Sequence, residues 1–237
     1  MSNSFSQNNL EEFNKYLLKG IRSILFILIP STAGIILLRT EIVRIILGSG
    51  HFGWEQTITT ANVLGYFALS LAAQGLIPLL SRAFYALQDT KTPTIISITS
   101  FLISIILGYI LSNFMGVAGL ALAFTIGSTI NFSLLYLLLR KKLIIFKDKE
   151  NSLLEFISKL IVATLVMIIF VQIGKILVGS IVDMQRFWGV FVKICGSIIL
   201  GGSVYLWLCH YFKCEEINDI KDLLAKKFKI NHGSNNE

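Results

Sequence analysis

The stretch TIISITSFLISIILGYILSNFMGVAGLALAFTIGSTINFSLLYLLL, residues 94–139, decides the fold of this chain, because it contains no aspartate, glutamate, lysine or arginine. A hydrocarbon core about 30 Å thick is crossed by roughly 20 apolar residues of helix at about 1.5 Å per residue. The stretch is long enough for two crossings. It predicts a pair of transmembrane helices, at about 94–112 and 117–139.

The whole chain of 237 residues has the same character, with 54% hydrophobic residues, 15% charged residues and a mean hydropathy of +0.72. This composition is typical of membrane proteins. We therefore expect an all-α integral membrane protein with six transmembrane helices in a domain at 21–212, after a polar segment at 1–20 and before an amphipathic tail at 213–237. The other four spans are expected at about 21–38, 58–80, 153–178 and 188–209.

Basic residues collect on one side of these six spans. Of the 21 lysines and arginines, only Arg39, Arg44, Lys175, Arg186 and Lys193 fall on the other side. The positive-inside rule makes the basic-rich side cytoplasmic, so both termini are expected in the cytoplasm. The net charge of +7 then reflects topology and lipid head groups, and no nucleic-acid partner is needed to explain it.

One short connection, SRAFYALQDTKTP at residues 81–93, holds the strong polar features of the central chain. Thr92 before Pro93 predicts a helix N-cap followed by proline at the first helical position, where its missing N–H costs nothing. A new helix is therefore expected to begin at Pro93.

Patterns for covalent chemistry are missing. There is no glycine-rich phosphate loop, no nucleophile elbow and no pair of carboxylates inside a span, so an enzyme is disfavoured. The three histidines and three cysteines lack metal-ligand spacing, and we expect no metal and no cofactor.

Polar and small residues within the spans mark helix contacts. Gln74 and Asn131 each need a hydrogen-bond partner in lipid, either on a neighbouring helix or in a polar cavity. Gly119, Ala123 and Gly127 form a small-residue stripe that favours close helix packing over a substrate-lining role. Pro30 and Pro78 interrupt the first two spans and predict bends, static or hinged.

Four segments together resemble the MurJ/MviN lipid II flippases, of the multidrug/oligosaccharidyl-lipid/polysaccharide exporter superfamily. They are IPSTAG at 29–34, GSGHF at 48–52, RAFYALQDTKTP at 82–93 and GVAGLALA at 116–123. Their order and spacing also match, and the block at 82–93 is the most specific. The resemblance runs from about Leu17 to Arg140 and continues more loosely through the last two spans.

The resemblance implies a two-lobed exporter fold of about fourteen helices, of which this chain would be roughly the C-terminal lobe, with an N-terminal lobe missing. It implies an undecaprenyl-linked peptidoglycan precursor and membrane lipids as partners. The head group would be held by the other lobe, and the polyprenyl tail by a groove of the helices at 153–178 and 188–209. The candidate cytoplasmic gate or hinge consists of Arg82, Gln88, Asp89, Lys91 and Pro93. In such a gate Asp89 would pair with Arg82 or Lys91, the alternative being a helix cap and charge anchor.

Other functions stay open on the sequence alone. One is half of a polysaccharide or drug exporter with the same fold, and another is a non-transporting scaffold of cell-wall synthesis. A membrane glycosyltransferase is disfavoured, because the loops lack carboxylate motifs.

Overall fold

The computed structural model describes residues 10–47, 53–143, 150–181, 187–214 and 216–217, and this part of the chain is helical throughout, apart from turns and short connections. Gly48 to Phe52, which carry part of the resemblance above, and the tail beyond Ile217 lie outside the described residues. The helices are α1 (Leu10–Leu47), α2 (Trp54–Leu69), α3 (Leu71–Ala86), α4 (Lys91–Met115), α5 (Val117–Lys142), α6 (Glu150–Ile181) and α7 (Phe187–Tyr211).

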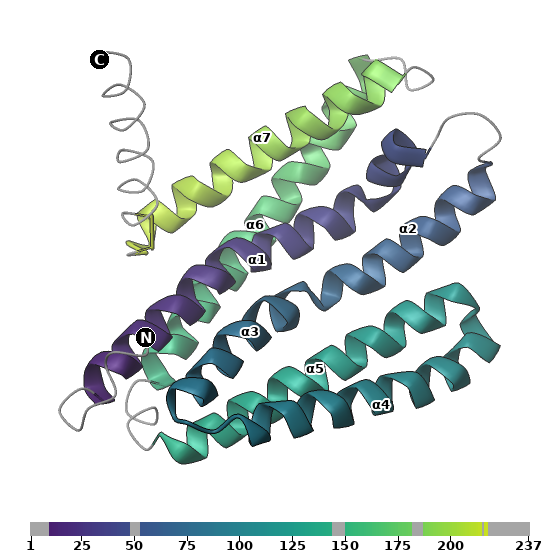
Figure 1. Ribbon diagram of the computed structural model, residues 1–237. Coiled ribbons are helices and arrows are strands. Elements are labelled where there is room, and N and C mark those ends of the chain that lie inside the picture. Colours follow the sequence, from purple (N-terminus) through teal and green to yellow (C-terminus); the bar gives the residue numbers. More distant parts are fainter. Residues whose placement is uncertain (1–9, 48–52, 144–149, 182–186, 215, 218–237) are drawn as a thin grey trace, which may run out of the picture.

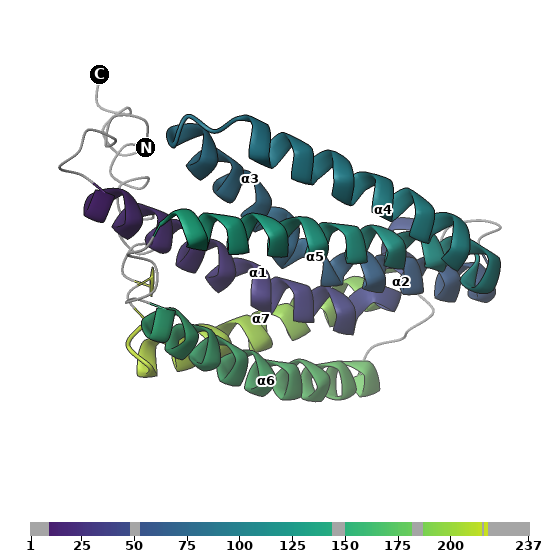
Figure 2. The ribbon, with the colours of Figure 1, turned by 90° about the horizontal axis from the view of Figure 1, so that it is seen from below.

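The long helix α1 lies in the middle of the bundle, between two groups (Figures 1 and 2). On one side lie α2 and α3, followed by the closely packed hairpin of α4 and α5. On the other side lies the hairpin of α6 and α7, which contacts the rest of the described chain chiefly through α1. The packing of the α6–α7 hairpin onto the bundle therefore depends mainly on α1.

The described residues contain six helical stretches long and apolar enough to cross a membrane, which confirms the predicted fold class. Figure 1 shows that the starts of α1, α4 and α6 and the ends of α3, α5 and α7 lie at one end of the bundle. The two sides on which the sequence sorts its basic residues are thus the two ends of the bundle.

The first predicted boundary is wrong. Helix α1 begins at Leu10, inside the segment expected to be a polar N-terminal extension, and Phe13 and Leu17 of that segment are fully buried. At its other end α1 continues past residue 38 to Leu47, so residues 39–47 extend the same helix. The ends of α4, α5, α6 and α7 lie within about three residues of the ends of the last four predicted spans.

The second predicted span, 58–80, is two helices, and the break falls at Ser70, with Pro78 inside α3. In a continuous helix Ser70 N–H would bond to the carbonyl of Tyr66. It bonds instead to Phe67 O at 3.0 Å, and Tyr66 O accepts a hydrogen bond from Thr125 Oγ1 of α5 at 2.7 Å. A side chain of a neighbouring helix therefore satisfies the carbonyl that the break releases.

Candidate functional site

The connection between α3 and α4 is built by its backbone. Gln88 has a φ of +58°, and its N–H bonds to Tyr85 O at 3.0 Å. The next N–H, of Asp89, reaches back to Phe84 O at 3.0 Å. These two bonds form a Schellman motif with Gln88 in the left-handed position, which ends α3 and turns the chain toward α4.

Gln88 carries a conformational cost that glycine would avoid. A residue with a Cβ in the left-handed region costs roughly 1–2 kcal/mol, partly offset by the larger unfolded-state entropy of glycine. We expect Gln88→Gly to raise the melting temperature in detergent by about 1–4 °C. Gln88→Ala keeps the strain and is the matched control, so equal stability of the two variants would contradict this account.

Asp89 joins three helices at this connection. Its carboxylate accepts hydrogen bonds from Thr92 N–H at 3.0 Å and from Thr92 Oγ1 at 2.7 Å, and it forms an ion pair with Lys142 at the end of α5. Lys142 Nζ also lies 5.5 Å from the centre of the Phe84 ring on α3. The carboxylate thus ties the end of α3, the start of α4 and the end of α5 together.

This geometry corrects two expectations. Helix α4 begins at Lys91 and is capped by Asp89, so neither Thr92 as N-cap nor Pro93 as first helical residue is right. The partner of Asp89 is Lys142; within the described chain Arg82 and Lys91 are exposed and pair with no carboxylate. Of the five candidate gate residues, the structure therefore brings only the backbone turn at Gln88 and the side chain of Asp89 into one junction, beside the buried Pro93.

Acid should weaken the junction at Asp89. The hydrogen bond from Lys142, and then those from Thr92, hold the pKa of the Asp89 carboxyl well below its ordinary value. A lowered pKa contributes stability that is complete above the unfolded-state pKa of about 3.9 and is lost as the pH falls further. We expect the melting temperature of the wild type to fall below about pH 4 more steeply than that of Asp89→Asn, which has no carboxyl to titrate.

The control for this pH experiment is Glu55→Gln, at the opposite end of the bundle, whose profile should follow that of the wild type. Parallel profiles for the wild type and Asp89→Asn would contradict the junction.

The two polar candidates within the spans make separate local contacts. Gln74 Nε2 donates to Ser70 Oγ at 2.5 Å, across the break between α2 and α3. Asn131 Nδ2 on α5 lies 3.4 Å from Ser97 Oγ on α4, and its Oδ1 is buried without a hydrogen-bond partner. No hydrogen bond joins the two in the described residues, and the expected polar cavity remains a proposal.

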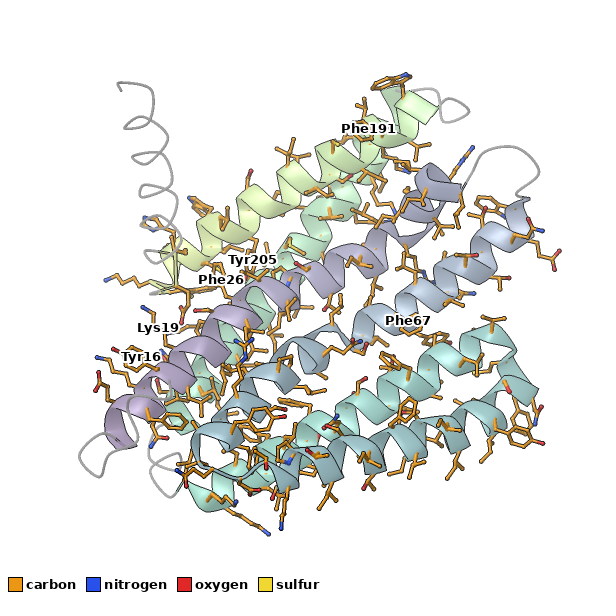
Figure 3. All side chains as sticks on the ribbon, viewed as in Figure 1. Tyr16, Lys19, Phe26, Phe67, Phe191 and Tyr205 are labelled. Carbon is orange, nitrogen blue, oxygen red and sulfur yellow. The ribbon has the colours of Figure 1, made fainter. Side chains whose placement is uncertain are left out.

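An apolar groove of about 510 Å³ lies between α1, α6 and α7. The resemblance implies a groove formed by the last two helices. In the structure α6 and α7 form two walls of this groove, and α1 forms the third. Figure 3 shows Phe26 of α1 and Tyr205 of α7 next to each other at this groove. The other residues that line it are almost all aliphatic or glycine, and include Gly34, Val171, Ile198 and Gly202.

A charged cluster ties the same three helices together nearer the C-terminal end of α1. Glu41 Oε1 lies 2.9 Å from Lys175 Nζ of α6 and 3.3 Å from Lys193 Nζ of α7. Lys175 Nζ also donates to Leu37 O at 2.8 Å. The three charged side chains are only 9–17% exposed. Glu41 lies beyond the predicted end of the first span at residue 38, in the part of α1 that continues to Leu47.

Comparisons with known proteins agree on one family. The family model for the lipid II flippase MurJ matches residues 1–197. A probable lipid II flippase MurJ of Buchnera aphidicola is 28% identical over 88% of this chain, and a lipid II flippase MurJ of Thermosipho africanus is 36% identical over 60% of it. These alignments cover 40% and 29% of the two relatives.

A solved structure has the same fold. The lipid II flippase MurJ in an inward closed conformation matches 89% of this chain with a TM-score of 0.65 and 26% sequence identity. The match covers 41% of that protein, so the chain spans about two fifths of its length.

Proposed function

The chain belongs to the MurJ family of lipid II flippases, and from this we propose that it serves as the C-terminal portion of a flippase that moves the lipid-linked peptidoglycan precursor, lipid II, across the bacterial inner membrane. The groove between α1, α6 and α7 is the observation that carries the proposal. Its volume lies in the range typical of ligand sites, and its walls suit a hydrocarbon chain. The undecaprenyl tail of lipid II is such a chain.

The head group needs groups that the groove does not offer. A pyrophosphate is best held by several cationic side chains, and the groove lining contains no charged residue among the described positions. Lys175 and Lys193, on the two helices that form the groove with α1, are already paired with Glu41. We therefore propose that a second lobe, in the same polypeptide or in a separate one, holds the head group.

The proposed orientation places both termini in the cytoplasm, with the junction of α3, α4 and α5 on the same side. Alternating access requires one lobe to rock against another around a central site. Gln88 and Asp89 lie at the junction beside Pro93, and we propose that these three residues form a cytoplasmic gate together with the neighbouring exposed Arg82 and Lys91. The exposed ion pair of Asp89 with Lys142 can break and reform at small cost.

Photo-crosslinking tests the groove directly. A photoreactive amino acid at Ile198 in the groove is expected to label radioactive lipid II, and excess unlabelled lipid II should compete with the labelling. Ile95 on α4 is the matched control, because it is similarly exposed, at 62% against 53%, but does not line the groove. Equal, non-competed labelling at both positions would show only general contact with lipid and would overturn the proposal.

A further inference from the structure

Pro30 leaves a backbone carbonyl in the wall of the groove without its usual hydrogen-bond donor. In a continuous α-helix, residue 30 would donate its N–H to the carbonyl of Phe26, but proline has no N–H to give. Pro30 lies inside α1, so the Phe26 carbonyl lacks the donor that a continuous helix would supply from residue 30. In a hydrocarbon environment without water such a carbonyl must find another donor or pay a large free-energy cost.

Tyr205 supplies that donor from α7. Its hydroxyl donates to Phe26 O at 2.7 Å, and its side chain is 4% exposed. The rings of Tyr205 and Phe26 lie 5.4 Å apart between their centres, tilted by 52°. Phe26, Pro30 and Tyr205 all line the apolar groove, so the hydrogen bond crosses from one wall of the groove to the other.

We infer that these three groups form a polar catch: the Phe26 carbonyl, freed by Pro30, and the Tyr205 hydroxyl hold α7 against α1 and set the width of the groove. The α6–α7 hairpin contacts the rest of the described chain chiefly through α1, so this hydrogen bond, together with the ion pairs of Glu41, holds the spacing between the two walls. Tyr205 is thus a positioning residue. Its effect on the lipid tail rests on the proposed function, whereas the catch itself does not.

A double-mutant cycle with Tyr205→Phe and Pro30→Ala tests the catch. Tyr205→Phe keeps the ring and leaves the Phe26 carbonyl unpaired, which should lower the melting temperature by about 3–9 °C. Pro30→Ala restores an N–H donor within α1. In the Pro30→Ala background Tyr205→Phe should therefore cost less than a third as much, because the carbonyl stays satisfied.

Tyr211→Phe is the matched control for the cycle. Tyr211 lies on the same helix, is 73% exposed and stacks on Trp207, so loss of its hydroxyl should leave the melting temperature unchanged in both backgrounds. An equal loss from Tyr205→Phe in the two backgrounds would overturn the inference.

Labelling of lipid II at Ile198 separates positioning from stability. In Tyr205→Phe the labelling should fall severalfold, and it should stay low in the double variant even though the melting temperature recovers. Recovery of labelling together with stability would overturn the positioning role. If the wild type itself gave no competed labelling, the proposed function would fail, while the stability cycle would still decide the catch.

Discussion

Gly119→Ala is expected to destabilise the protein by about 2–4 kcal/mol, because it places an atom where α4 and α5 already touch. A Cβ at Gly119 would overlap the carbonyl oxygen of Leu111 and lie 2.5 Å from its carbonyl carbon and 2.9 Å from Ser112 N. All of these are backbone atoms of α4, which cannot rotate away as the end of a side chain can. The hairpin would have to separate, with loss of contacts along its length.

Gly202→Ala in α7 is the matched control for Gly119. A Cβ there has no heavy atom within 4 Å, and alanine is the better helix former by about 1 kcal/mol. Melting temperatures of the two purified variants should therefore move in opposite directions. Equal stability of Gly119→Ala and Gly202→Ala would contradict the close contact of α4 with α5.

Glu41→Gln is expected to cost about 3–5 kcal/mol, because it removes the negative partner of two largely buried lysines. The Coulomb attraction of the Glu41 carboxylate for Lys175 and Lys193 is then lost in a region of low dielectric. Since Glu41 belongs to α1 and the lysines belong to α6 and α7, the substitution should loosen the α6–α7 hairpin first. Faster proteolysis within that hairpin, with a lower melting temperature, is the measurement.

Two further variants show whether the buried charge is the cause. The triple variant Glu41→Leu, Lys175→Met, Lys193→Met removes all three charges and should regain most of the stability, as apolar replacements of buried ion pairs often do. Glu155→Gln breaks the pair of Glu155 with Lys159, whose side chains are 67% and 38% exposed, and should change little. A tolerated Glu41→Gln, or a triple variant less stable than the single one, would contradict the account.

The sequence predicted the helices well where composition decides them. The start of the span at Val117 agrees with the structure because Gly116, at φ +59°, leaves the chain no helical continuation there. The small-residue stripe at Gly119, Ala123 and Gly127 is a feature of helix packing, since Gly119 lies against the backbone of α4 and Gly127 against the Ser104 side chain and the Ser100 carbonyl of the same helix. These are local properties, readable from neighbouring residues.

The errors come from contacts between distant residues. The sequence around Ser70 gives no stronger sign of a helix break than Pro78 does, although Pro78 lies inside α3. The break depends on Thr125 of α5, whose hydroxyl donates to the carbonyl of Tyr66. The ion pair of Asp89 with Lys142 likewise forms because the end of α3 packs against the end of α5. Pro30 predicts a bend in the first span, but the sequence does not show that Tyr205 of α7 donates a hydrogen bond to the carbonyl that this proline frees.

The central claim is that this chain works as the C-terminal part of a lipid II flippase and needs a second lobe to hold the head group. Complementation of a flippase-depleted bacterium tests it most directly, with the chain produced alone and then with a separately encoded N-terminal lobe of a relative, and with membrane levels checked in both strains. We expect growth to be restored only when both parts are present. Failure of the pair at normal membrane levels would contradict the flippase function, and rescue by the chain alone would contradict the need for a second lobe.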